Sequence, residues 1–144
     1  MALRALDTNG YVELLRGSPR AAAIRAALGG AGTDLVVLMP VMAELQQGAR
    51  TTAEARALAV RFLDPVPAGR RVAADAAEWV ATGARIAAMA RAGHDREELT
   101  QRAFFLDVHI AQVCRARGIV LWTDDADHAR LRAHVGHRVE PLPR

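Results

Sequence analysis

The chain has 144 residues, of which 51% are hydrophobic and 24% charged. This length suits one domain with a sizeable core, and the composition excludes an intrinsically disordered chain. The formal net charge of +3 favours an acidic or polyanionic partner, but all 19 basic residues are arginine and 31 residues are alanine; this skew is typical of a GC-rich genome, so the charge supports nucleic-acid binding only slightly.

Nothing in the sequence predicts a membrane span or an export signal. No apolar run approaches the roughly 20 residues that a spanning helix needs, and no basic region precedes an apolar segment at the N-terminus. We therefore expect a cytoplasmic protein. The single cysteine, Cys114, lies in an apolar helical pattern, which indicates a buried, unreactive thiol.

The first 28 residues predict a strand followed by two helices. A short apolar run ends at Asp7, after which a helical pattern continues to Gly17. Ser18 and Pro19 form a start signal for a helix over 20–28. Ligand sites in open α/β sheets gather at the carboxyl ends of strands, so Asp7 is a candidate site residue, although aspartate is also a common helix cap.

The middle of the chain predicts a buried strand, several helices and a loop. The uninterrupted apolar run 34–39 fits a strand buried on both faces, as in a parallel sheet. Three helical patterns follow: 41–49, a segment from Thr51 onward, and 73–92. The segment 64–69 is predicted to be a loop with a short edge strand near Val66, and 94–98 a polar connection.

The last third of the chain completes an alternating pattern. It predicts a helix over 100–117, a buried strand over 118–123, a helix over 128–135 and a last edge strand over 138–142. Helices alternating with short apolar strands predict an α/β fold. We expect a three-layer-like sandwich with a short central parallel sheet flanked by helices, formed as a single domain over 1–144.

Acidic residues far apart in the sequence occupy compatible positions in this fold. Parallel strands point the same way, so Asp7 and the acids after Thr123 would emerge at one edge, and Glu44 starts near that edge. Asp107 interrupts an apolar helix face, where an ionised carboxylate is costly unless it is paired or metal-bound. Clustered carboxylates repel one another, and a hard divalent cation, Mg²⁺ or Mn²⁺, relieves that repulsion.

Some of these acids have simpler explanations. Asp124, Asp125 and Asp127 begin a predicted helix, where the helix dipole favours negative charge, so one or two of them are expected to be caps only. Glu44 alone would also fit a solvated helix residue.

Zinc is not expected at this site. Cys114 is isolated and the five histidines show no ligand spacing. His128, His134 and His137 lie near one another, and we expect them to be exposed residues of a C-terminal helix rather than ligands.

Taken in order, these motifs resemble those of a PIN-domain ribonuclease, specifically a VapC-type toxin of a type II toxin–antitoxin pair. The motifs are Asp7-Thr-Asn9, the segment 40–48 around Glu44, the segment from Asp107 through the strand 118–123, and Thr123-Asp-Asp125. The offset from Thr123 favours Asp125 as the fourth acid, with Asp124 second. The chain departs from the family pattern at His128, where the family often has phenylalanine.

The resemblance implies a magnesium-dependent (or manganese-dependent) endoribonuclease that hydrolyses RNA phosphodiester bonds. The implied roles are Asp7 and Asp107 as main metal ligands, Glu44 and Asp125 as the acids completing the pocket, Thr123 as a hydrogen-bond donor to a carboxylate or a metal-bound water, Asn9 as the residue orienting Asp7, and Asp124 as a supporting acid. The sequence leaves open whether one or two ions bind.

The resemblance also implies partners. These are an RNA substrate, an antitoxin that inserts a basic side chain into the acidic pocket, and a second copy in a homodimer. Apolar helix residues could line a partner groove, although core packing explains them equally well: Ile24, Leu28, Leu58 and Phe62.

Two other functions fit parts of this pattern. The first is a catalytically inactive PIN-like interaction module. The presence of acids at all four motif positions argues against it. The second is an aspartate-based phosphatase or receiver-like domain, a chemistry that usually requires a lysine, and this chain contains none.

Overall fold

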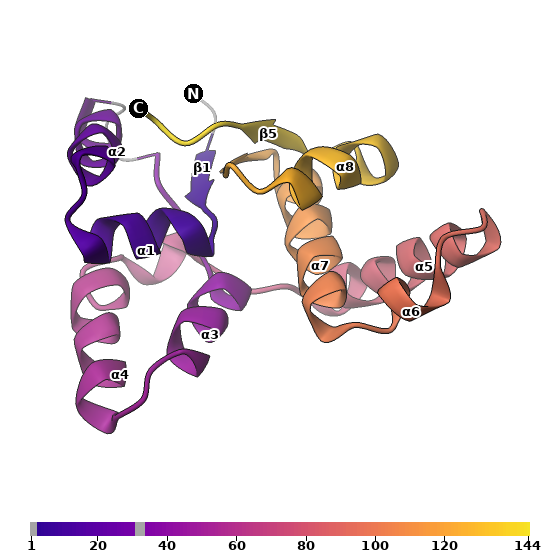
Figure 1. The fold of residues 1–144 in the computed structure, drawn as a ribbon, viewed down its shortest axis with the longest axis horizontal. Coiled ribbons are helices and arrows are strands. Elements are labelled where there is room, and N and C mark those ends of the chain that lie inside the picture. Colours follow the sequence, from indigo (N-terminus) through magenta and orange to yellow (C-terminus); the bar gives the residue numbers. More distant parts are fainter. Residues whose placement is uncertain (1–2, 31–33) are drawn as a thin grey trace.

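The computed structural model describes residues 3–30 and 34–144 (Figure 1). Its strands are β1 (Leu3–Leu6), β2 (Val37–Leu38), β3 (Arg71–Val72), β4 (Ile119–Trp122) and β5 (Arg138–Glu140). Its α-helices are α1 (Thr8–Arg16), α2 (Pro19–Gly30), α3 (Met39–Gln47), α4 (Thr52–Leu58), α5 (Ala76–Arg91), α6 (Arg96–Leu99), α7 (Arg102–Arg117) and α8 (Ala126–Val135). A π-helical turn (Ala59–Leu63) extends α4, and a short 3-10 turn (Ala68–Arg70) precedes β3.

The strands pair in parallel throughout. One sheet has the order β1-β4-β5, so β4 is central, and all four of its residues are buried. The pair β2–β3 lies beside it, linked by a bridge between Arg4 and Leu35. The prediction of an α/β fold with a short parallel sheet is therefore confirmed.

Helices cover the sheet, and α7 is the helix with the longest run of buried residues. α7 packs against β4 and also against α5, so its residues from Val108 to Cys114 are all buried. In Figure 1, α1, α2 and α4 lie on one side of α7, and α5 and α6 lie on the other. The buried thiol of Cys114 sits in this core, and burial raises its pKa to about 12, as an unreactive cysteine requires.

Two local predictions were wrong. The edge strand was expected near Val66, but the strand of this region, β3, begins at Arg71. The reason is that a 3-10 turn follows Pro67 and delays the start of the strand. The polar connection 94–98 contains α6, whose start is stabilised by the Asp95 side chain accepting from the Glu97 amide.

Other boundaries moved by a few residues. α1 begins at Thr8, whereas the helical pattern in the sequence begins at Tyr11. α5 begins at Ala76 rather than at residue 73, because Asp75 and Glu78 form a capping box. Within the part of the chain that the structure describes, no helix is both long and apolar enough to cross a membrane.

Candidate metal centre

Asp7 lies where β1 meets α1 and is 5% exposed. Its Oδ1 accepts a hydrogen bond from the Thr8 amide at 2.8 Å, so it is the N-cap of α1. Its Oδ2 accepts from the Thr123 hydroxyl at 2.9 Å. The parallel register pairs Leu6 with Trp122, which sets Asp7 beside Thr123 at the carboxyl ends of two neighbouring strands. The residue is thus both a cap and part of the acidic site.

Glu44 reaches the same place from α3. Its carboxylate accepts a hydrogen bond from the Thr8 hydroxyl at 2.5 Å. Thr8 therefore positions Glu44. The sequence did not predict this contact, because Thr8 stood out only as the small polar residue between Asp7 and Asn9.

Asp107 enters from α7, with its side chain 20% exposed. Burial, and after it the negative charges of Asp7, Asp125, Glu44 and Asp127, together raise its pKa to about 7. This carboxyl group is therefore partly protonated at neutral pH unless a cation offsets the surrounding charge.

The three acids after Thr123 separate in space. Asp125 caps α8 by accepting from the Asp127 amide at 2.9 Å, and its own amide donates to the Thr123 hydroxyl at 3.0 Å. Asp127, one of the acids that could have been only a helix cap, lies with it: one oxygen each of Asp107, Asp125 and Asp127 falls within 4.8 Å of the others.

Asp124 turns away from this group. It forms an ion pair with Arg20 and accepts from the Leu142 amide at 3.2 Å. Asp124, the second choice for the fourth acid, therefore lies outside the pocket, because α2 and the C-terminal segment hold its side chain there.

The acids together line one open pocket of about 520 Å³. Five carboxylates face it: Asp7, Glu44, Asp107, Asp125 and Asp127. Among the described residues, its lining contains no arginine or histidine to offset them. This donor set suits a hard divalent cation. The raised pKa of Asp107 reflects its burial first and then the repulsion from the other carboxylates, which such a cation would relieve.

Comparison with known proteins identifies the family. The model of the PIN domain family matches residues 4–133. The chain belongs to the PIN domain family. A chain in the 2.2 Å resolution structure of VapBC-1 from nontypeable Haemophilus influenzae shares the fold, with a TM-score of 0.69 and 16% sequence identity over 97% of this chain and 98% of that one. No curated protein sequence gave a significant match.

Thr8 and Thr123, rather than Asn9, make the hydrogen bonds to Asp7 among the described residues. Asn9 lines the pocket and is exposed. The Thr123 hydroxyl holds Asp7 in place, because it donates to the Asp7 carboxylate and accepts from the Asp125 amide.

The histidine prediction was wrong for two of the three residues. His134 is exposed, but His128 and His137 are 0% and 1% exposed. α8 packs its inner face on α7 and β5, and that face carries His128, Leu131 and Val135. The spacing of three and four residues was a helical signal for burial that the sequence analysis did not use.

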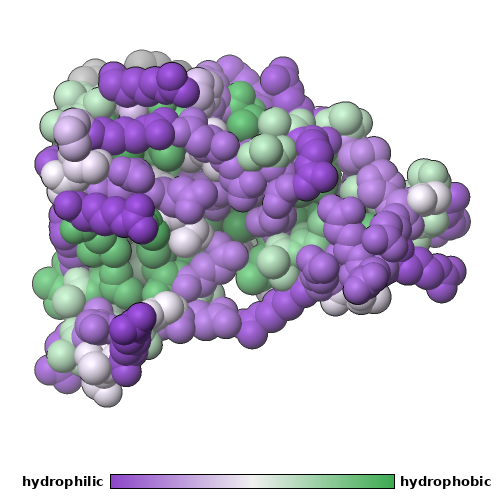
Figure 2. All heavy atoms as spheres, viewed as in Figure 1, coloured by the Kyte–Doolittle hydropathy of each residue, from purple (hydrophilic) through white to green (hydrophobic). Residues whose placement is uncertain are grey.

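An apolar groove adjoins the acidic pocket. It is lined by side chains of α1, α3 and α4, including Val12, Leu45 and Leu58, and it shares Thr8 and Glu44 with the pocket. Figure 2 shows apolar surface in green between the polar rows on this side of the molecule. Of the four groove residues expected from the sequence, Leu58 lines it, whereas Ile24 is fully buried in the core, and Leu28 and Phe62 pack against that core.

Proposed function

We propose that this PIN domain is a divalent-metal-dependent endoribonuclease and the toxin of a toxin–antitoxin pair. The observation that carries the proposal is the convergence of five carboxylates, from β1, α3, α7 and the start of α8, on one open pocket. Unpaired carboxylates are costly to gather, so their convergence indicates a cation-binding function rather than a stabilising one.

The residues that would hold Mg²⁺ or Mn²⁺ are Asp7 and Asp107, with Glu44 and Asp125 completing the set and Asp127 close to Asp125. Carboxylate oxygens are the ligands that these ions prefer. When bound, the ion would supply a Lewis acid that activates water and offsets charge on the phosphate.

Two threonine side chains hold the acidic residues of the pocket in position. The Thr123 hydroxyl fixes Asp7 and Asp125 relative to each other through two hydrogen bonds, and Thr8 holds Glu44. Three of the pocket acids are thereby fixed before substrate arrives, which lowers the cost of ordering the site. The pocket is open, as a site for a polymeric substrate must be.

The groove supports the antitoxin part of the proposal. A peptide whose apolar side chains occupy the groove of Val12, Leu45 and Leu58 would pass beside Thr8 and Glu44. A basic side chain of that peptide would then reach the carboxylates and block the site. A homodimer remains part of this proposal, to be tested by the mass of the purified protein in solution.

The test is cleavage of total cellular RNA by purified protein with Mg²⁺ or Mn²⁺, with and without chelator. We expect discrete products carrying 5′-phosphate ends from wild type and from Asp64→Asn, which alters an exposed carboxylate outside the pocket. Asp7→Asn and Asp107→Asn should abolish cleavage while remaining folded. Retained cleavage in either variant would refute the assignment, and inactivity of the folded, metal-loaded wild type would favour the interaction module.

A further inference from the structure

A second pocket, of about 310 Å³, adjoins the acidic pocket, and Asp127 lines both of them. It lies among α5, α6, α7 and α8, whereas the apolar groove adjoins the acidic pocket at Thr8 and Glu44, on the side of α1 and α4. Its apolar lining comes from Met89 and Leu131, which are both buried. A ligand in this second pocket would therefore lie directly beside the pocket of five carboxylates.

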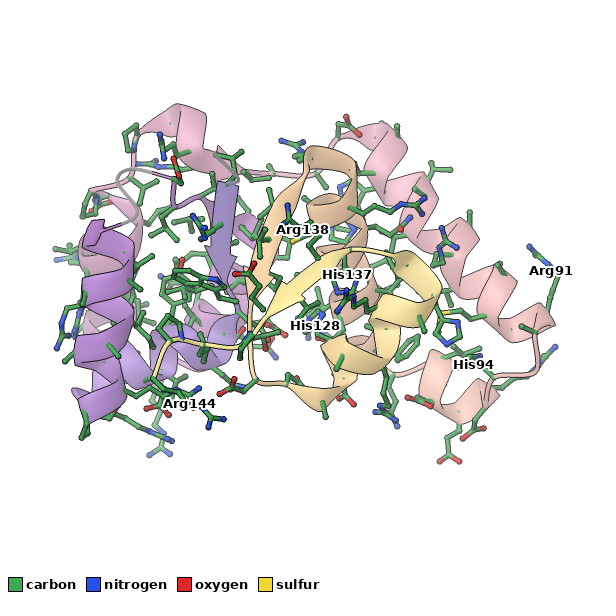
Figure 3. All side chains as sticks on the ribbon, turned by 90° about the horizontal axis from the view of Figure 1, so that it is seen from above. Arg91, His94, His128, His137, Arg138 and Arg144 are labelled. Atoms are coloured by element: carbon green, nitrogen blue, oxygen red, sulfur yellow. The ribbon has the colours of Figure 1, made fainter. Side chains whose placement is uncertain are left out.

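The second pocket is lined by three side-chain rings, and we name it the ring pocket after them: His94, Phe104 and His134. The exposed ring of His134 meets the half-buried ring of His94 edge-on, at 4.6 Å between centroids. Figure 3 shows the His94 side chain between α8 and α5. Phe104 is half-buried and packs against the core residues Met89 and Leu131. Unpaired RNA bases stack on rings of this kind, so the ring pocket fits a flat nucleobase.

Glu98 is the carboxylate of the ring pocket that is available to a ligand. It is half-buried, and its carboxylate accepts no hydrogen bond from the described residues, whereas Asp127 is ion-paired with Arg130. The two oxygens of a carboxylate can accept two parallel hydrogen bonds. Among the four RNA bases, guanine presents two adjacent donors, N1–H and N2–H, on its Watson–Crick edge, and the other three present one donor beside acceptors. The chemistry of Glu98 therefore matches guanine.

Arg130 supplies a positive charge at the boundary between the two pockets. It is exposed, lines the ring pocket and pairs with Asp127, three residues earlier on α8. Exposed ion pairs contribute little stability, so a phosphate can compete for this guanidinium at small cost. Arginine is well suited to bind RNA phosphates. A cation beside the acidic pocket, next to rings and a carboxylate, favours a nucleotide of the substrate over a segment of a protein partner.

We propose that the ring pocket binds an unpaired guanine of the RNA substrate, next to the phosphate at the acidic pocket, and that Glu98 sets this base preference. The three rings stack on the base, and Arg130 binds the phosphate of the same nucleotide. The inference rests on the proposed nuclease function and names part of its substrate.

The experiment titrates metal-free protein, in chelator, with the 5′-monophosphates of guanosine, inosine, adenosine, cytidine and uridine. Proton NMR of the imidazole signals of His94 and His134 follows binding. Inosine lacks only the N2 amino group of guanosine, so it reports the second hydrogen bond to the carboxylate. Glu98→Gln replaces one acceptor oxygen with a donor, and Glu97→Gln is the matched control at an exposed position of α6 outside the pocket lining. Phe104→Leu removes a ring and keeps an apolar side chain.

We expect wild type and Glu97→Gln to bind the guanosine nucleotide at least about tenfold more tightly than the other four, and Glu98→Gln to lose this preference. Phe104→Leu should weaken binding of all five nucleotides by about fivefold or more. In RNA cleaved with Mg²⁺ or Mn²⁺, guanosine should recur at a fixed position beside the cut for wild type but not for Glu98→Gln.

Equal binding of the five nucleotides to wild type, or an unchanged guanosine preference in Glu98→Gln, would overturn the assignment and leave the carboxylate site intact. Histidine signals that move on addition of the antitoxin, and with no nucleotide, would overturn it in favour of a protein contact. Because the titration needs neither metal nor cleavage, a guanosine preference in a protein that cleaves no RNA would support the base site while refuting the proposed nuclease function.

Discussion

Removing one charge from the pocket should stabilise the metal-free protein. The pKa of Asp107 rises from 3.8 to about 7, so the folded protein holds this proton more tightly than the unfolded chain does. The stability due to this proton is fully present below about pH 4 and is lost as the pH rises through about 7. In chelator at pH 8, the ionised carboxylate therefore lowers the free energy of unfolding.

The size of this destabilisation follows from the difference between the pKa of Asp107 in the folded protein and in the unfolded chain. A rise from 3.8 to about 7 corresponds to about 4 kcal/mol at pH 8. The side chain is 20% exposed, and screening by solvent reduces the effect to about 2 kcal/mol. For a chain of this size, Asp107→Asn should then raise the melting temperature by about 4–8 °C at pH 8.

Thermal unfolding followed by circular dichroism in chelator, at pH 4 and pH 8, checks this. Asp107→Asn and wild type should melt at similar temperatures at pH 4 and diverge at pH 8, while Asp64→Asn follows wild type at both. Added Mn²⁺ should raise the melting temperature of wild type far more than that of Asp107→Asn. If Asp107→Asn melts at or below wild type at pH 8, the proposed repulsion at this carboxylate is refuted.

Three further outcomes are expected. Thr123→Val removes the hydrogen bond to Asp7 and the acceptor for the Asp125 amide, so it should lower the free energy of unfolding by about 1–3 kcal/mol in denaturant titrations and reduce RNA cleavage. Asp125→Asn should reduce cleavage at least about 100-fold, whereas Asp124→Asn should leave it within a few-fold of wild type, and equal losses would contradict their different positions. Cys114 should react with a thiol reagent only as fast as the protein unfolds, because its thiol is buried with a pKa of about 12; rapid labelling of the folded protein would contradict this.

The sequence predicted the parts of the site that depend on local pattern. Asp7 follows a short apolar run, and Thr123 follows another, so parallel pairing of the two strands is enough to bring them together. Asp107 stood out because its neighbours along one helix are apolar. Of these neighbours, Val108, Ile110 and Ala111 are buried in the structure, and Phe104 and Phe105 are half-buried.

Other features depend on distant segments, which a single sequence does not reveal. Asp124 and Asp125 are adjacent, and what separates their side chains is Arg20, 104 positions away, together with the backbone of Leu142. The hydrogen bond from Thr123 to Asp7 also depends on distant segments, since it joins residues 116 positions apart.

Polar and charged groups whose surroundings are energetically unfavourable are concentrated at the acidic pocket. The His128 imidazole has no hydrogen-bond partner among the described residues, the Asp107 carboxyl group has a raised pKa, and the other acids of the pocket carry like charges. These groups all lie in or beside the acidic pocket. The fully buried strand β4 and the core around it tolerate this cost. Such conflicts between residue and environment are expected at functional sites, where stability is given up for chemistry. The same charge that should make Asp107→Asn more stable without metal should therefore make it inactive with metal, and one variant tests both consequences.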